Sequence, residues 1–72
     1  MSEIKTVDAR GLSCPQPVIL ARHAINQGVF PIQVVVDTGT SRDNVTRMAQ
    51  SVGCRVSVEA KEDQFILTIT KE

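Results

Sequence analysis

Apolar residues recur at every second position in two segments near the end of the chain, residues 54–60 and 65–70. This period of two is typical of β-strands that bury one face and leave the other in water. The side chains expected on the buried face are Cys54, Val56, Val58, Ala60, Phe65, Leu67 and Ile69. Residues Lys61–Gln64 between the segments are expected to form a hairpin loop. The chain must therefore fold so that one face of a sheet is covered.

Two helical patterns precede these strands, each with apolar residues at three- and four-residue spacing on one face. The apolar face of the first, over residues 15–27, consists of Val18, Ala21, Ala24 and Ile25. The apolar face of the second consists of Val45, Met48, Ala49 and Val52. Gly28 and Gly53 are expected to end the two helices. The turn Thr38–Ser41 offers an N-cap for the second helix, and Asp43, three positions after Thr40, suggests a weak capping box.

Strand-like segments at Ile4–Val7 and Ile32–Asp37 complete a β-α-β-α-β-β order. A crossover through a helix makes the first two strands parallel, whereas the final hairpin is antiparallel, so the sheet is mixed. Two helices on one face of four strands satisfy the one-sided burial, which predicts an α+β two-layer open sandwich. We expect residues 1–72 to form a single domain, near the lower size limit for an unaided core.

Composition argues against several classes of function. The 8 Lys and Arg residues balance the 8 Asp and Glu residues, and Trp and Tyr are absent, so neither charge nor stacking groups favour nucleic acid. The start carries no signal-peptide pattern and no segment is apolar enough to cross a bilayer, so we expect a cytoplasmic protein without membrane insertion. With His23 as the single histidine and no Cys-x-x-Cys pair, neither a metal site nor a cofactor is expected.

The two cysteines of the chain receive different predictions. Cys54 falls on the apolar face of its strand, and we interpret it as a core residue, with any redox role left open. Cys14 stands directly before Pro15, which disfavours a helical conformation at Cys14 and suits it to the N-cap position. A helix N-terminus favours thiolate over thiol, and the thiolate is the nucleophile. Cys14 is therefore the candidate catalytic residue, and a structural disulfide with Cys54 is not expected.

The segment from Asp8 to Pro17, which reads Asp-Ala-Arg-Gly-Leu-Ser-Cys-Pro-Gln-Pro, resembles the signature of the TusA-like (SirA-like) sulfur-carrier family, whose hallmark is Cys-Pro-x-Pro after Gly-Leu-x. The resemblance extends over the length, the element order and the stretch from Asp37 to Asp43. The same segment is also similar to the N-terminal domain of YedF-type proteins linked to selenium metabolism. Gln16 stands where the carriers of tRNA thiolation usually have Glu, which leaves the pathway open.

The resemblance implies a sulfurtransferase that acts as a stoichiometric carrier of persulfide sulfur on Cys14. Its donor would be a cysteine desulfurase or a rhodanese-like protein, and an acceptor protein or enzyme would take the sulfur onward. A non-catalytic regulatory or interaction module, or a selenium-delivery domain with the same thiol, remains an alternative function.

Five residues are expected to support the start of the first helix and the loop before it. Pro15 and Pro17 would fix the first helical turn, and Gly11 would allow a tight turn before it. Leu12 would act as a hydrophobic staple under the helix. Asp8 would either orient the loop by accepting backbone N–H groups or cap the strand.

Four further residues are candidates for partner docking. Ile19 lies off the buried face, in line with Gln16 and His23, and it is either part of a docking patch or a singly exposed apolar residue. Arg10 and Arg42 would either flank the thiol and meet an acidic partner surface or stay solvated. His23 is expected on the surface, too far along the helix to act as a base.

Overall fold

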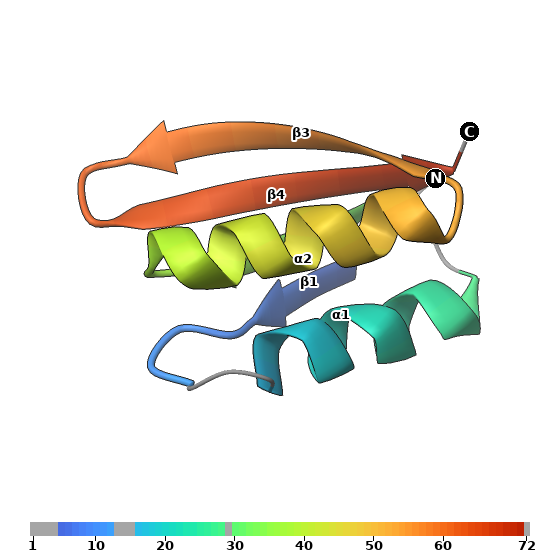
Figure 1. Cartoon of the computed structure of the whole chain (residues 1–72), viewed down its shortest axis with the longest axis horizontal. Coiled ribbons are helices and arrows are strands. Elements are labelled where there is room, and N and C mark those ends of the chain that lie inside the picture. Colours follow the sequence, from blue (N-terminus) through green and yellow to red (C-terminus); the bar gives the residue numbers. More distant parts are fainter. Residues whose placement is uncertain (1–4, 13–15, 29, 72) are drawn as a thin grey trace.

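The computed structural model describes residues 5–12, 16–28 and 30–71, and it arranges them as two helices against one sheet (Figure 1). The elements in chain order are β1 (Lys5–Asp8), α1 (Gln16–Gln27), β2 (Ile32–Val36), α2 (Gly39–Ser51), β3 (Cys54–Lys61) and β4 (Gln64–Lys71). The predicted order β-α-β-α-β-β and the α+β class are confirmed.

The sheet has four strands in the order β1-β2-β4-β3. β1 runs parallel to β2, and the other two pairings are antiparallel, so the sheet is mixed as predicted. The last strand, β4, therefore lies between β2 and β3. In β2, Val34 is opposite Val7 of β1 on one side and Leu67 of β4 on the other. This arrangement leaves β1 and β3 at the two edges.

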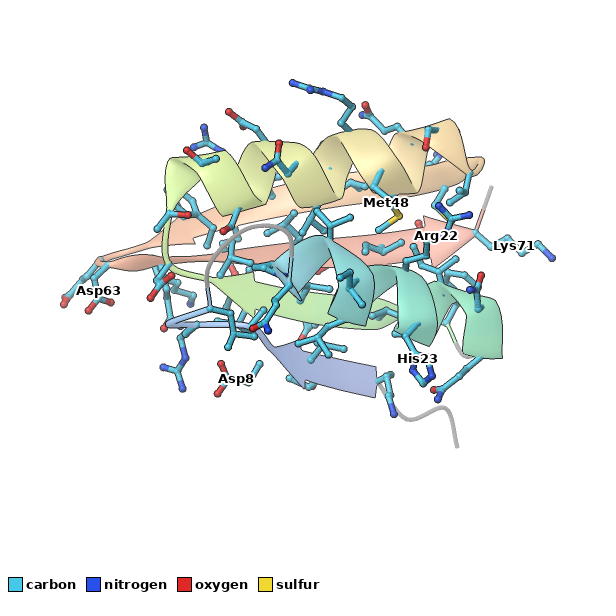
Figure 2. All side chains as sticks on the ribbon, turned by 60° about the horizontal axis from the view of Figure 1, so that its bottom comes forward. Asp8, Arg22, His23, Met48, Asp63 and Lys71 are labelled. Atoms are coloured by element: carbon cyan, nitrogen blue, oxygen red, sulfur yellow. The ribbon has the colours of Figure 1, made fainter. Side chains whose placement is uncertain are left out.

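Both helices cover the same face of the sheet, and the core lies between the two layers (Figures 1 and 2). Side chains on β2 alternate between buried and half-buried positions, as expected for a sheet with one covered face. The buried apolar residues of the sheet include Ile32, Val34, Val36, Leu67 and Ile69. The helices contribute small residues, Ala21, Ala24, Val45 and Ala49, which let them approach the strands closely.

The start of α2 differs from the expected capping box. The N-cap residue is Thr38, whose backbone is extended and whose hydroxyl accepts the N–H of Ser41 at 3.0 Å. Thr40 already lies inside the helix, so it is no N-cap, and Asp43 pairs with Arg42 at 2.9 Å. The N-cap therefore lies in the predicted turn Thr38–Ser41, but the capping box expected from Thr40 and Asp43 is wrong, because the helix starts at Gly39, directly after Thr38.

The strand β3 is less covered than its alternating pattern predicted. Cys54 at its start is buried, but Val58, expected on the buried face, is 46% exposed. β3 is an edge strand with a neighbour on one side only, and the helices cover mainly its start. The hairpin is also tighter than expected, because Lys61 and Gln64 pair with each other and leave only two residues in the turn. Within the described ranges, no helix is long and apolar enough to cross a membrane.

Candidate functional site

The loop between β1 and α1 leads to the candidate nucleophile. Cys14 and Pro15 lie outside the described residues, so the site is built from the residues on either side of them. On one side the loop runs to Leu12, which packs partly against the core. On the other side α1 begins at Gln16, and Pro17 in its first turn is fully buried. Both ends of the short connection that carries Cys14 are therefore anchored to the folded structure.

Asp8 holds the first part of this loop through Arg10. Its carboxylate accepts the backbone N–H of Arg10 at 3.1 Å and two guanidinium N–H groups at 3.0 Å each. The hydrogen bonds from the Arg10 side chain, followed by the bond from its backbone, lower the pKa of Asp8 to about 2. Both side chains are more than half exposed, so this pair shapes the loop more than it stabilises the fold.

Gly11 makes the tight turn that follows. Its φ of +75° lies in the left-handed region, which glycine adopts without strain. Its N–H donates to Asp37 at 2.9 Å, and the preceding Ala9 N–H donates to the carbonyl of Val35 at 2.8 Å. The loop is thereby tied to the end of β2, the parallel neighbour of β1.

The contact between Asp37 and this loop was not predicted from the sequence. The sequence placed Asp37 as the last residue of the second strand, whereas β2 ends at Val36 and Asp37 follows it. One signal was available, because the carboxyl ends of parallel strands meet at one edge of a sheet. An acidic residue directly after β2 therefore lies near the loop that follows β1.

An open, polar hollow of about 620 Å³ lies beside this loop. Its lining residues are Asp8, Arg10, Gly11, Asp37, Asp63 and Gln64. Asp63 comes from the hairpin between β3 and β4, and Figure 2 shows it at the same end of the molecule as Asp8. Three carboxylates thus lie around one guanidinium. The hydrogen bond with Asp8, followed by the charges of Asp8, Asp37 and Asp63, raises the pKa of Arg10.

A second hollow, of about 340 Å³, is mainly apolar. It is lined by Leu12, Gln16, Ile19 and Leu20. Ile19 is 57% exposed and Leu20 is 38% exposed, so apolar surface of α1 faces solvent here. Leu12 and Gln16 are the described residues that flank the Cys14 segment in the sequence. Sequence reasoning had not included Leu20, which follows Ile19 directly.

The two candidate docking arginines contact neighbouring residues at the start of β4. Arg10 donates to the side-chain carbonyl of Gln64 at 3.2 Å, and the Arg42 guanidinium lies 4.7 Å from the ring centre of Phe65. The structure therefore brings both arginines to one end of the sheet. It also gives each of them an aspartate partner within the chain, Asp8 and Asp43.

The two remaining candidates are His23 and Cys54. His23 is exposed and lies further along α1 than Ile19, where it lines a third hollow together with Asp8 and Leu20 (Figure 2). Cys54 is buried in the core as a free thiol. Among the described residues, no group of three or more His, Cys, Asp or Glu side chains is arranged to hold a metal ion.

Comparison with known proteins supports the family suggested by the Cys-Pro-x-Pro segment. The family model for sulfurtransferase TusA matches residues 5–71. The crystal structure of a SirA-like protein from Desulfitobacterium hafniense superposes with a TM-score of 0.83 at 31% identity, covering 97% of this chain and all of that one. No curated protein matches the chain. Because the family model spans nearly the whole sequence, the chain belongs to the TusA (SirA-like) family of sulfurtransferases.

Proposed function

We propose that this protein is a sulfur carrier that holds persulfide sulfur on Cys14 and passes it to an acceptor protein. The observation that carries the proposal is the match to the TusA sulfurtransferase family over residues 5–71, which includes the only Cys-Pro-x-Pro segment of the chain. The geometry supports it, because Leu12 and Pro17 anchor the chain on both sides of Cys14. We place the carrier in the cytoplasm, where free thiols persist.

The transfer step exchanges one sulfur atom without net oxidation. The Cys14 thiolate attacks the terminal sulfur of a persulfide on the donor protein, and a new S–S bond forms on Cys14. The S–S bond of the donor breaks, and the donor cysteine leaves as a thiolate. The acceptor's thiolate then attacks the terminal sulfur of the Cys14 persulfide, the S–S bond on Cys14 breaks, and Cys14 leaves as a thiolate. A cysteine desulfurase or a rhodanese-like protein fits the donor role.

We infer that the start of α1, and not a side-chain base, activates Cys14. The first turn of α1 contains no acidic residue, so no carboxylate opposes the positive end of the helix dipole there. His23 lies further along the helix and is exposed to solvent. A helix N-terminus lowers the pKa of a cysteine from about 8.5 into a range of about 3.5–7.5. The same environment stabilises the persulfide anion that forms after transfer.

Partner proteins are proposed to dock over the hollow lined by Leu12, Gln16, Ile19 and Leu20. Direct sulfur exchange requires contact between the two proteins around Cys14, and two lining residues of this hollow, Leu12 and Gln16, are the described residues that flank Cys14 in the sequence. Its exposed apolar side chains supply contact surface of the kind that interface cores use. Arg10 and Arg42, at the same end of the sheet as Gly11, are proposed to meet acidic groups of the partner.

Mass spectrometry after incubation with a cysteine desulfurase and L-cysteine tests the proposal. The wild type should gain about 32 Da, one sulfur atom, on the peptide that contains Cys14. Cys14→Ser should gain none, whereas Cys54→Ser, the matched control at a buried cysteine, should load like the wild type. Loading of Cys14→Ser, or a biological effect that survives this substitution unchanged, would instead support a non-catalytic interaction module.

A further inference from the structure

We propose that the outer edge of β3 pairs with the same edge of a second copy of this chain, which joins two four-stranded sheets into one. This inference goes beyond the proposed function and does not depend on Cys14. β3 is an edge strand, and among the described residues β4 is the strand that pairs with it. Figure 1 shows β3 at the margin of the sheet that lies away from β1.

The edge of β3 is long and regular. An edge strand exposes N–H and C=O groups that pair readily with another chain, and proteins counter this with short strands, prolines, bulges or charges. β3 has eight residues, contains no proline and pairs with β4 without a bulge, from Cys54 opposite Lys71 to Lys61 opposite Gln64. β1, at the other edge, has only four residues. Of the two edges, β3 is therefore the better template for an added strand.

The hairpin turn determines which backbone groups face this edge. Lys61 and Gln64 flank a two-residue turn, so they form a hydrogen-bonded pair of the antiparallel ladder. Hydrogen-bonded and non-hydrogen-bonded pairs alternate along such a ladder. The odd-numbered residues of β3 therefore bond to β4. The N–H and C=O groups of the even-numbered residues, among them Val56 and Val58, point away from β4.

The charges on β3 are complementary to those of a second β3 in one antiparallel register. A two-fold axis through Ser57 places Arg55 of each copy opposite Glu59 of the other, which gives two pairs of opposite charge. Both pairs are non-hydrogen-bonded, the type in which side chains approach most closely. An axis through Val58 would instead place Arg55 opposite Lys61, with like charges facing each other. The charges thus select the axis through Ser57.

The exposure of the side chains fits the same register. Arg55 and Glu59 are both exposed, and Glu59 contacts Lys61 only at 3.9 Å, which leaves its carboxylate accessible to a second copy. On the face that carries the helices, Val58 is 46% exposed and would lie opposite Val56 of the second copy. Pairing therefore covers an apolar side chain that the single chain leaves in water, and it adds a β-branched cross-strand pair on each side of the axis.

The helices leave the proposed interface separate from the hollow on α1. α2 packs against β3 and β4, whereas α1 packs against β1 and β2. The hollow that includes Ile19 and Leu20 of α1 therefore belongs to the other half of the molecule. A dimer through β3 keeps that hollow accessible to a further protein.

Analytical ultracentrifugation of charge-reversal variants under reducing conditions tests the register. The wild type should show a reversible equilibrium between one chain and two, up to millimolar concentration. Arg55→Glu and Glu59→Lys each place like charges opposite each other twice, so each should raise the Kd of the dimer by about tenfold. An equimolar mixture of these two variants restores both pairs of opposite charge and should dimerise like the wild type. Glu62→Lys, the matched control, makes the same charge change in the turn beyond β3 and should leave the Kd unchanged.

Hydrogen exchange of the wild type locates the interface. The N–H groups of Val56 and Val58 should exchange more slowly as the protein concentration rises. A wild type that sediments as one chain up to millimolar concentration overturns the proposal, and so does a dimer that both single reversals leave intact or that the mixture fails to restore. Concentration-dependent protection of β1 in place of β3 overturns it as well. Neither measurement involves sulfur transfer, so failure of persulfide loading would refute the proposed function and leave this result standing.

Discussion

Pro17 is the residue whose substitution tests the packing of this site most sharply. The Cys-Pro-x-Pro pattern marks it as a residue of the first helical turn, yet its side chain is also among the largest that are fully buried. Its missing N–H costs nothing in the first turn of α1, where N–H groups have no partner within the helix. Substitution by alanine therefore removes packing without repairing a hydrogen bond.

The expected loss of stability follows from the groups removed. Pro17→Ala deletes two buried methylene groups, which at about 0.8 kcal/mol each accounts for about 1.6 kcal/mol of transfer free energy. The unfolded chain gains freedom when proline is lost, which adds about 0.4–1 kcal/mol. We therefore expect a decrease of about 2–2.6 kcal/mol in the free energy of unfolding. That is a large share of the roughly 4–11 kcal/mol typical of a chain of this length.

Urea unfolding followed by circular dichroism measures this change. At a slope of about 1 kcal/mol per molar urea, the midpoint should fall by about 2 M. Gln16→Ala is the matched control, because Gln16 precedes Pro17 in the same turn but is exposed, and its effect should stay within about 0.5 kcal/mol. If Pro17→Ala also changes stability by less than about 0.5 kcal/mol, the assignment of Pro17 to the core is refuted.

Three further predictions concern the loop and the buried cysteine. The pKa of Asp8 is lowered to about 2 in the folded protein, below its ordinary value. The contribution of Asp8 to stability is therefore present above about pH 4 and is lost as the pH falls through about 2. Asp8→Asn should remove this acid dependence of the unfolding free energy. Gly11→Ala should cost about 1–2 kcal/mol through backbone strain alone, and an unchanged urea midpoint would contradict the left-handed turn. Cys54 is 6% exposed, so iodoacetamide should label it only after unfolding, and labelling under native conditions at the rate of Cys14 would show that it is not a core residue.

The fold was largely predictable because the spacing of apolar residues within each helix and strand indicates its type of secondary structure. The two-residue period of residues 54–60 and 65–70 and the helical spacing of the two apolar faces depend on neighbours along the chain. Val58 shows the limit of this information. Its position in the pattern identifies the face it occupies, but not how far α2 extends over an edge strand.

The turn at Gly11 and the position of Pro17 in the first turn of α1 were predictable from the sequence, whereas the contacts around them were much less so. The contact between Asp37 and Gly11 joins positions far apart in the sequence, and no local pattern encodes it. The same holds for the contact of Arg10 with Gln64, which depends on β4 lying beside β2. Thr38 and Thr40 are equally suitable caps by residue type, so only the point where the helix begins decides between them. Tertiary arrangement, not residue preference, determined each of these outcomes.

The most direct test of the account is to follow the sulfur on Cys14 through one cycle of loading and release. The protein, incubated with a cysteine desulfurase and L-cysteine and then separated from them, should carry about one extra sulfur, about 32 Da, on the Cys14 peptide. Addition of a thiol-bearing acceptor should return that peptide to its original mass while the acceptor gains the sulfur. An added mass that stays on Cys14 in the presence of acceptor, or that appears on Cys54, would contradict a role as sulfur carrier.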